Sequence, residues 1–358
     1  MKILDYYILK KYLGAFFYMV FAFILVICVI DFTDKNDEFI ENKVPFWEII
    51  FDYYFNLIPY LANFLSPLMV FLSTIFVTAK LAAHTEIVAM LSSGVSFWRI
   101  LRPYFFGALM LGGLTFYLMG WLIPRANEDR INFELTYTED PKEFDGKNIH
   151  YRLQYDLYAY VHTYNSNTDI GRLFTLERIK DKQIVERLTS NRIMWIDSLE
   201  KWRLDPYTIR TFDGEKETLS YHDKTDTILD LFPRDFEVEY KVHEKLTIPQ
   251  MKAHIEEMEL RGKPNIDFYR IQYYERFTYP FAIIILSMIG VVVSARKSRE
   301  GVGMQLIVGF ILAFCYFAVL QLGRNFAEDR SIHPLMSAWI PNIVFLILGY
   351  ILYRKLPK

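Results

Sequence analysis

Hydrophobic positions along the chain form six long runs, three before and three after a polar block at residues 125–270. A helix of about 20 mostly apolar residues crosses a hydrocarbon core about 30 Å thick. The pattern therefore predicts a membrane α-helical protein with six transmembrane helices (3+3) and one inserted domain, dividing the chain at 1–124, 125–270 and 271–358. The runs are Tyr12–Ile30, Tyr53–Val77, Tyr104–Ile123, Phe277–Val293, Val302–Gly323 and Leu335–Tyr353.

Charged residues between the runs predict the orientation of the chain. Loops and termini on one side carry mostly Lys and Arg. The loop after the first run carries mostly Asp and Glu, and the loop after the fifth contains Glu328 and Asp329. Positively charged loops stay in the cytoplasm. We therefore expect a multi-pass membrane protein with both termini cytoplasmic and the central domain on the far side, which in a bacterium is the periplasm. The basic positions include Lys10, Lys11, Lys80, Arg99, Arg102, Arg296, Arg354 and Lys355, and the acidic ones include Asp31, Asp34, Asp37, Glu38, Glu41, Glu328 and Asp329.

The inserted block consists of short segments rich in Tyr, Ile, Val, Thr, Phe and Trp, separated by turn-forming residues. Many short strands with little helix predict an all-β domain with a sandwich or jelly-roll-like fold. One helix, Ile248–Arg261, is predicted to close the domain, with Thr247 as its cap, Gln250 three residues on and Gly262 as its stop. The expected strands are Asn148–Gln154, Leu157–Tyr164, Leu173–Ile179, Ile184–Thr189, Arg192–Asp197, Lys201–Leu204 and Tyr207–Phe212.

Two of the expected strands show alternation. Ile193 and Trp195, and then Trp202 and Leu204, recur at every second position. This period of two is typical of a sheet with one buried face. We expect one alternating set to face the inside of the domain, either these side chains or neighbours of opposite phase such as Arg192 and Met194.

No pattern in the sequence is typical of an enzyme active site. The five histidines of the polar block lack the spacing of a metal site, and the chain has neither a GxSxG elbow nor a Gly-rich phosphate loop. A net charge of −2 without a basic, aromatic-interleaved stripe argues against binding nucleic acid. We therefore expect no catalytic residues, no metal and no directly bound cofactor.

The segment His84–Ser96, between the second and third runs, is predicted to form a short cytoplasmic helix. Ile87, Met90 and Leu91 recur at helical spacing, and Glu86 supplies an acid at the positive end, with Thr85 as the expected cap. One interpretation is an amphipathic helix on the membrane surface. The other is a coupling helix that fits a groove of a partner protein, with Glu86 as its charged anchor.

Several segments, in order along the chain, resemble one known family. They are Ile3–Leu13, Thr85–Ser96, Ile123–Asn127, Glu275-Arg276 with Pro280, Arg299–Gly303 with Gly309, and Ala338–Asn342 with Phe345 and Gly349. Their order and spacing resemble the lipopolysaccharide export permease family, LptF/LptG, over essentially the whole chain. The compact length is more similar to the LptG branch. The soluble block adds little motif, and Tyr6 stands where the family commonly has arginine.

The resemblance implies a permease subunit rather than an enzyme. Such a subunit pairs with a paralogous permease (LptF, if this chain is of the LptG branch) and binds the cytoplasmic ATPase LptB. The assembly extracts lipopolysaccharide from the inner membrane and passes it to periplasmic LptC, along a bridge toward the outer membrane. The chain has no GxxxxGK[ST], so ATP and Mg are expected to act through the partner ATPase.

A lipid with several acyl chains and phosphates requires an apolar wall and cations near the outer interface. We expect Phe16, Phe17, Phe310 and Phe314 to supply the wall. The candidate head-group cations are Lys35, Lys43, Arg125 and Arg324, because they lie at the periplasmic ends, where most other charges are acidic. The alternative for each of the four cations is an ordinary interface residue.

Two other classes of function remain open on the sequence alone. A secondary lipid transporter would carry ionisable residues within its spans, but Asp52 and Glu275 lie near the ends of theirs. A membrane scaffold without a transport role would leave the helix of Glu86 without a function.

Overall fold

The computed structural model describes residues 3–138, 145–165, 168–214, 216–236, 241–262, 266–296 and 301–355. The chain divides into two compact units. The helical unit comprises Met1–Glu139, His243–Met251 and Asp267–Lys358, and the β unit comprises Asp140–Val242 and Lys252–Ile266. The helical unit thus extends further along the chain than the expected third span, to Glu139, and it takes in His243–Met251 from the part of the chain after the sheet.

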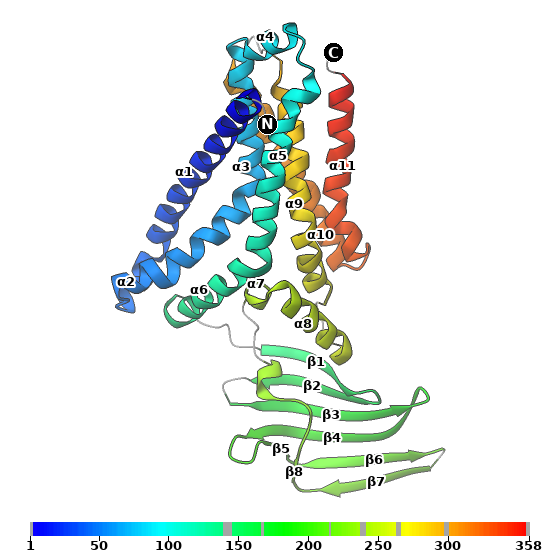
Figure 1. Cartoon of the computed structure of the whole chain (residues 1–358). Helices are drawn as coiled ribbons and strands as arrows, with labels where there is room; N and C mark the ends of the chain where they lie inside the picture. Colours follow the sequence, from blue (N-terminus) through cyan, green and yellow to red (C-terminus); the bar gives the residue numbers. More distant parts are fainter. Residues whose placement is uncertain are drawn as a thin grey trace. The chain divides into compact units, whose positions relative to one another are not determined.

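Among its described residues, the helical unit contains six helical spans that are long and apolar enough to cross a membrane, which confirms the predicted membrane-helical class (Figure 1). Four are single helices: α1 (Ile3–Glu41), α9 (Ile266–Ser294), α10 (Val302–Glu328) and α11 (Pro334–Arg354). The second span joins α2 (Phe46–Glu48), a π-helical turn η1 (Ile49–Tyr54) and α3 (Phe55–Ala83). The third joins α5 (Phe97–Tyr117), a second π turn η2 (Leu118–Leu122) and α6 (Ile123–Tyr137).

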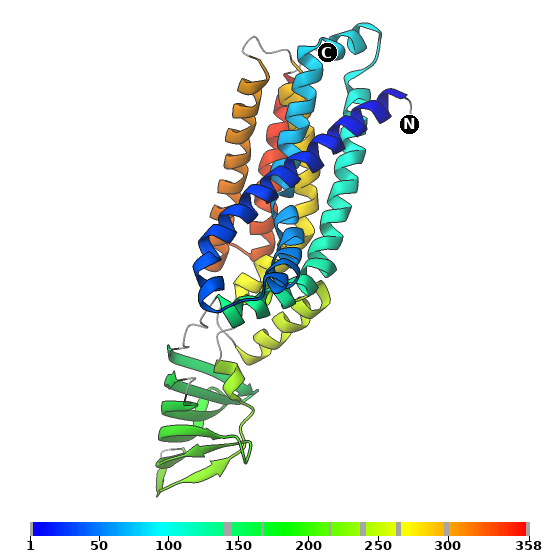
Figure 2. The ribbon, with the colours of Figure 1, turned by 90° about the vertical axis from the view of Figure 1, so that its left-hand side faces the viewer.

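Helix α1 is longer than its apolar run at both ends. No glycine or proline interrupts the polar residues after Ile30, so the helix continues until the chain turns at Lys43, with φ +51°, before Pro45. The apolar part of α1 buries one narrow stripe with residues four apart, and Phe39 is buried near the end of the helix. The stripe consists of Ile8, Tyr12, Phe16, Val20 and Ile24. Figure 2 shows this helix running obliquely across the bundle.

Helices α3 and α9 form the interior of the helical unit, because they bury far more of their apolar spans than α1, α10 and α11 do. Their contact is made by small residues. Gly290 of α9 lies against Thr74 of α3, and the Thr74 hydroxyl is 3.2 Å from that of Ser287. Small side chains and shared hydroxyl hydrogen bonds are what allow membrane helices to approach closely.

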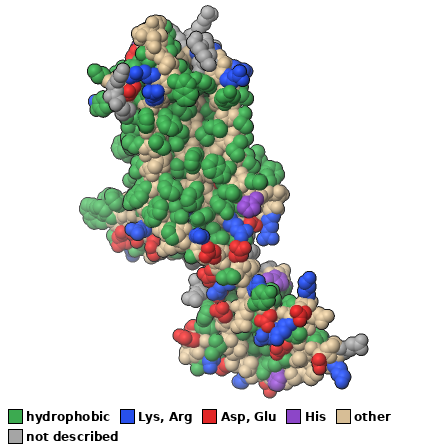
Figure 3. Space-filling model, turned by 45° about the vertical axis from the view of Figure 1, so that its right-hand side comes forward, with side chains coloured by type: hydrophobic (Ala, Val, Ile, Leu, Met, Phe, Trp, Pro, Cys, Tyr) green, Lys and Arg blue, Asp and Glu red, His purple; other side chains and the backbone are tan. Residues whose placement is uncertain are grey.

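Hydrophobic side chains cover much of the visible surface of the helical unit between two ends rich in charged residues (Figure 3). The short helix α4 (Glu86–Ser92) lies at the same end of this unit as both chain termini (Figure 1). Its start differs from the prediction in one respect: Thr85 does not cap it. Thr85 has φ +60°, and its hydroxyl donates to the His84 carbonyl, so the hydroxyl turns away from the helix.

In the described part of the β unit there is one antiparallel sheet of eight strands, which confirms the predicted all-β insertion. Strand β4 is its centre, pairing with β3 on one side and, on the other, with β6 along its first half and β5 along its second. Strand β4 changes its partner from β6 to β5 after Ser190. At this point the Ser190 hydroxyl bonds to the carbonyls of Arg192 and Pro206. The strands are β1 (Asp145–Gln154), β2 (Leu157–Asn165), β3 (Ile170–Lys180), β4 (Gln183–Ile196), β5 (Lys201–Leu204), β6 (Tyr207–Asp213), β7 (Lys216–His222) and β8 (Thr225–Thr227).

Two predicted strands are therefore one continuous strand, β4, and two strands were not predicted. Strands β7 and β8 have mostly polar, exposed residues, so they show no apolar alternation. The expected alternation on β4 and β5 is confirmed: Ile193, Trp202 and Leu204 are fully buried, and Trp195 packs against them. Phe236 completes this core by stacking on Tyr164, with 4.0 Å between ring centroids.

Three short helices follow the sheet: η3 (Pro233–Phe236), α7 (Val242–Lys245) and α8 (Ile248–Arg261). Helix α8 has the predicted bounds, and the Gln250 side chain accepts from the Thr247 backbone at 2.9 Å, as in a capping box. Gly262, with φ +63°, ends it in the left-handed conformation that glycine adopts without strain.

Candidate functional site

A cavity of about 750 Å³ lies inside the helical unit, within the usual size range of ligand sites. It is lined by α3, η2, α6, α7, α9 and α10. Most of its lining side chains are apolar, and the polar ones include Glu275, Arg276 and Arg324. A cavity that is apolar with a few polar groups suits an amphiphilic ligand.

One face of α10 combines the apolar and the charged parts of the cavity. Phe310, Phe314, Phe317, Gln321 and Arg324 recur at spacings of three or four residues, and all of them line the cavity. Fourteen residues of helix rise about 21 Å. This stripe of α10 therefore carries three phenyl rings followed, further along the helix, by one guanidinium group. Its length is comparable to that of an acyl chain.

Arg324 forms a two-pronged ion pair with Glu275 of α9. Its Nε lies 2.6 Å from Oε1 and its Nη2 lies 2.5 Å from Oε2, which is the parallel geometry of the strongest arginine–carboxylate pairs. The carboxylate side chain is only 5% exposed, whereas the arginine side chain is 31% exposed. Arg324 therefore keeps an accessible side, although its charge is balanced.

The second arginine of the cavity is occupied by the backbone. Arg276 donates to the carbonyls of Leu246 and His243, at 2.6 and 2.8 Å. Asn127 of α6 donates to the Glu244 carbonyl at 3.2 Å. These bonds fix α7 and the chain after it against the bundle, as one part of the cavity wall.

Two amide oxygens of the cavity lining are buried without a hydrogen-bond partner in the described part of the chain. They belong to Asn63 of α3 and Asn127 of α6. A buried acceptor without a partner costs free energy, on the order of 1–3 kcal/mol. Both oxygens lie beneath the accessible surface of the cavity wall, so the guanidinium of Arg324 is the exposed charged group there.

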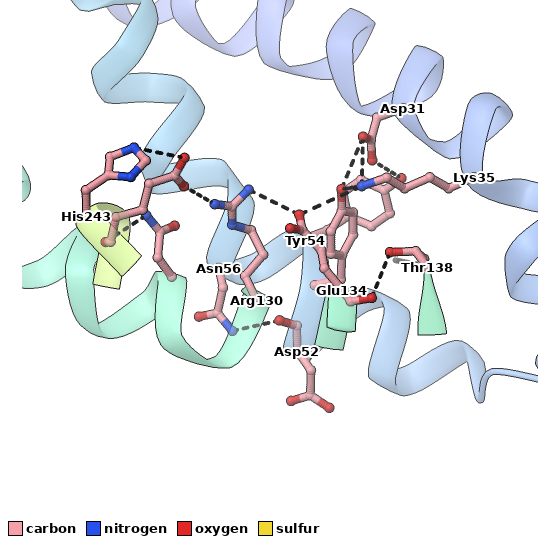
Figure 4. Close-up of polar contacts among 12 residues, drawn as sticks. Asp31, Lys35, Asp52, Tyr54, Asn56, Arg130, Glu134, Thr138 and His243 are labelled. Carbon is pink, nitrogen blue, oxygen red and sulfur yellow. Dashed lines mark hydrogen bonds and ion pairs between the residues drawn. The ribbon is translucent and has the colours of Figure 1, made fainter. Parts of the chain in front are cut away.

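A network of alternating charges links α1, α6 and α7 next to this cavity (Figure 4). Lys35 of α1 lies 3.5 Å from Asp31 and 3.8 Å from Glu134, and Glu134 lies 3.3 Å from Arg130. Arg130 in turn bonds to Glu244 at 2.5 Å. Because Arg130 and Glu134 are buried, each charge relies on its neighbours in the network for the stabilisation that water would otherwise supply.

The π turn η1 brings two consecutive tyrosines to the same carboxylate. Tyr53 and Tyr54 each donate to Asp31 at 3.1 Å, and Tyr53 also contacts Lys35. Single π turns recur at functional sites, because they re-aim neighbouring side chains. No pattern along the chain predicts this turn.

The four predicted head-group cations lie in different surroundings. Lys35 belongs to the charge network and Arg324 lies in the cavity, paired with Glu275. Lys43 and Arg125 are exposed, and no ion pair involves them among the described residues. The structure therefore does not gather the four into one cluster.

The four predicted phenylalanines also separate. Phe310 and Phe314 line the cavity, and Phe314 is 80% exposed. Phe17 is exposed on α1, outside the cavity lining, and Phe16 is buried in the helical core. Of the four, only Phe310 and Phe314 are placed to contact a ligand in this cavity.

The predicted coupling residues lie on α4 at the other end of the helical unit. Glu86 and Leu91 are accessible, and Val88 is exposed beside them, whereas Ile87 is buried and Met90 packs against the core. The Glu86 carboxylate already has partners on α1, since it lies 3.6 Å from Lys11 and accepts from Tyr7 at 3.0 Å. A partner protein would therefore meet Val88, Glu86 and Leu91, while Ile87 anchors the helix.

Sequence reasoning missed Glu275, Asn63 and Asn127 as cavity residues. A signal existed for Glu275, because this charged residue lies just before an expected apolar run, and a charge in a membrane span is rarely without a role. Nothing in the sequence shows which side chain faces it, since Glu275 and Arg324 are 49 residues apart.

Comparisons with known proteins agree with this architecture. The family model of the lipopolysaccharide export system permease LptF/LptG matches residues 6–355. A protein of Haemophilus influenzae, the lipopolysaccharide export system permease protein LptG, is 17% identical over 354 residues, covering 98% of both chains. Since the family model covers nearly the whole chain, this chain belongs to the LptF/LptG family of lipopolysaccharide export permeases.

Proposed function

We propose that this chain is the transmembrane permease subunit of an ATP-driven lipopolysaccharide exporter. In this role it extracts lipopolysaccharide from the inner membrane and passes it to a periplasmic bridge toward the outer membrane. The observation that carries the proposal is the cavity stripe on α10, where Phe310, Phe314 and Phe317 lie in line below Arg324. This arrangement suits a lipid with an anionic head.

The partners follow from the family and from what the chain lacks. A paralogous permease of the LptF type would complete the transmembrane assembly, and LptC would receive the lipid. The sequence has no phosphate-binding loop, so a separate ATPase, LptB, would bind ATP and Mg. The exposed side chains Val88, Glu86 and Leu91 of α4 form the surface on which we expect that ATPase to dock.

The proposed orientation places α4 and both termini in the cytoplasm and the β unit in the periplasm. The cavity then lies toward the outer leaflet, from which the lipid is taken. Lys43 and Arg125, which are exposed at this end of the helical unit, would attract the phosphates of the head group before the lipid reaches Arg324.

A photo-crosslinking experiment tests the proposal. The chain is purified with its partners in lipid nanodiscs containing lipopolysaccharide, with a photo-reactive residue in place of Phe314. Phe106 of α5 serves as the matched control, because it is also an exposed phenylalanine but does not line the cavity. We expect lipopolysaccharide adducts at position 314 that decrease when ATP is added, and few at position 106.

Two results would contradict the proposal. Equal labelling at both positions would show that the cavity does not select lipopolysaccharide over bulk lipid. Labelling at position 314 that ATP does not change would favour a secondary transporter or a scaffold over an ATP-driven exporter.

A further inference from the structure

We propose that Glu275 is a specificity residue, which lets lipids with a phosphomonoester head displace it from Arg324 and excludes lipids with a phosphodiester head. The inference rests on the proposed function, because it takes the α10 cavity to be a lipid site. It adds a reason why the cavity would not fill with the phosphodiester lipids that make up most of a bilayer.

The geometry places one exchangeable cation in the cavity. The described lining residues include two arginines, and Arg276 uses its terminal nitrogens for two backbone carbonyls. Arg324 uses only Nε and Nη2 for Glu275, its one ion-pair partner among the described residues. A guanidinium has five N–H donors, so Arg324 retains donors for a ligand on its exposed side.

The exposure of the pair sets the direction of the exchange. The Glu275 side chain is almost completely buried, and the Arg324 side chain is about a third exposed. A ligand therefore reaches the guanidinium first and competes with the carboxylate for it. Glu275 stays behind in the wall, where its charge repels any anion that does not hold Arg324 more strongly.

Charge decides which anions succeed. A phosphomonoester carries about −1.5 to −2 charges at pH 7 and presents three acceptor oxygens. A phosphodiester and the carboxylate of Glu275 each carry one negative charge. A phosphodiester that replaces Glu275 at Arg324 therefore gains no extra attraction to offset its repulsion by Glu275. Only the monoester makes a stronger contact with Arg324 than the contact it replaces.

The simpler alternative is that the pair only fastens α9 to α10. A fastening pair would affect the stability of the protein and leave the relative affinity for two anionic lipids unchanged. The two interpretations therefore differ in a measurable ratio, which does not depend on how well each variant folds.

The experiment measures the binding of two lipids with identical acyl chains, dioleoyl phosphatidic acid and dioleoyl phosphatidylglycerol, to the purified full-length chain. Phosphatidic acid has a phosphomonoester head and phosphatidylglycerol a phosphodiester head. We expect the wild type to prefer phosphatidic acid by about tenfold. Glu275→Gln should bind phosphatidylglycerol more tightly and reduce the preference to less than about threefold. Glu128→Gln, on the exposed surface of α6 outside the cavity lining, is the matched control and should keep the wild-type ratio.

A double variant covers the case in which Glu275→Gln alone does not fold. Glu275→Gln with Arg324→Gln leaves two neutral amides at the pair and should bind both lipids with equal, reduced affinity. The proposal is overturned if the wild type does not distinguish the lipids, or if either variant keeps the wild-type ratio.

A further arm separates this inference from the proposed function. Lipopolysaccharide and phosphatidic acid share the phosphomonoester, so each is used to compete with the other in the wild type. Selectivity for phosphatidic acid without competition by lipopolysaccharide would uphold the role of Glu275 and overturn the proposed substrate. If lipopolysaccharide competes but Glu275→Gln keeps the wild-type preference for phosphatidic acid over phosphatidylglycerol, the proposed substrate is upheld and the role of Glu275 is overturned.

Discussion

The Glu86 carboxylate of α4 lies 3.6 Å from the Lys11 ammonium of α1, and it accepts a hydrogen bond from Tyr7 on the same helix at 3.0 Å. A second ion pair, between Asp5 of α1 and Arg99 of α5, lies at 3.9 Å. The short helix proposed to receive the ATPase is thus tied to α1 by its own anchor residue. A displacement of α4 would therefore be transmitted to α1 directly through the contacts of Glu86 with Lys11 and Tyr7.

Glu86→Ala should weaken docking of the ATPase, because a charge-assisted contact at an interface contributes about 1.5–3 kcal/mol. The residue is accessible, so the protein should still fold and enter the membrane. Co-purification of the ATPase with the permease measures the effect. Normal association and normal lipid release in the variant would show that α4 is not the coupling element.

Lys11→Met separates the two roles of Glu86. It removes the intramolecular ion pair but leaves the carboxylate and the exposed apolar residues of α4 in place. We expect ATPase association to stay near the wild-type level, while lipid release per ATP hydrolysed falls. If Lys11→Met instead lost the ATPase to the same extent as Glu86→Ala, Glu86 would serve only to hold α4 in position.

Neutralising Lys43 or Arg125 should reduce lipopolysaccharide crosslinking more than it reduces complex assembly. Both side chains are exposed without an ion pair among the described residues, so their charge is available to a phosphate. Lys180, at the end of β3, and Lys182, in the turn that follows it, are the matched controls. Equal losses from the two pairs would identify Lys43 and Arg125 as general interface residues.

Lys35 should behave differently from Lys43, although both were predicted from the same charge pattern. Removing the Lys35 ammonium leaves Asp31 and buried Glu134 with one fewer cation, so Lys35→Gln should destabilise the protein by about 1–3 kcal/mol. Lys43→Gln should change the free energy of unfolding by less than about 0.5 kcal/mol. Thermal unfolding in detergent compares them, and equal midpoints would contradict the structural role of the charge network.

A photo-reactive residue at Ile193 or Met194 tests whether lipid passes through the β unit. Ile193 points into the core closed by Phe236 and Leu231, and Met194 lies on the opposite face of β4. Lipid passing through the core should label position 193 in an ATP-dependent way and label position 194 far less. Because the core is filled, this route requires the segment that carries Leu231 and Phe236 to move. Equal labelling at positions 193 and 194, or labelling that ATP does not change, would favour a β unit that only docks a partner.

Gly290→Ala should destabilise the helical unit by about 1–3 kcal/mol. The added methyl group would lie 3.0 Å from Thr74 and 3.2 Å from Phe71, so the interior helices would have to separate. Gly113→Ala is the matched control, because nothing lies within 4 Å of its new methyl group. A lower unfolding midpoint is expected for the first variant only, and identical midpoints would show that α3 and α9 are not closely packed.

The sequence by itself determined the elements whose signal is local. Six apolar runs predict six spans, since a backbone in lipid must satisfy its own hydrogen bonds within a helix. Apolar residues at every second position, beginning at Ile193 on β4 and at Trp202 on β5, predict the buried face of the sheet. Thr247 and Gly262 set the bounds of α8. Each of these inferences uses residues close together in the chain. Strands β7 and β8 escaped prediction because their residues are mostly exposed and polar.

The tertiary structure alone decided which predicted residues share a site. It separates Phe16 from Phe314 and Lys35 from Arg324, although each pair has the same chemistry and a similar place in its span. It also joins Glu275 to Arg324, because the packing of α9 against α10 brings together residues that no local pattern relates. A helical period fixes the direction of a side chain around its own axis. The partner that it faces depends on how the helices pack.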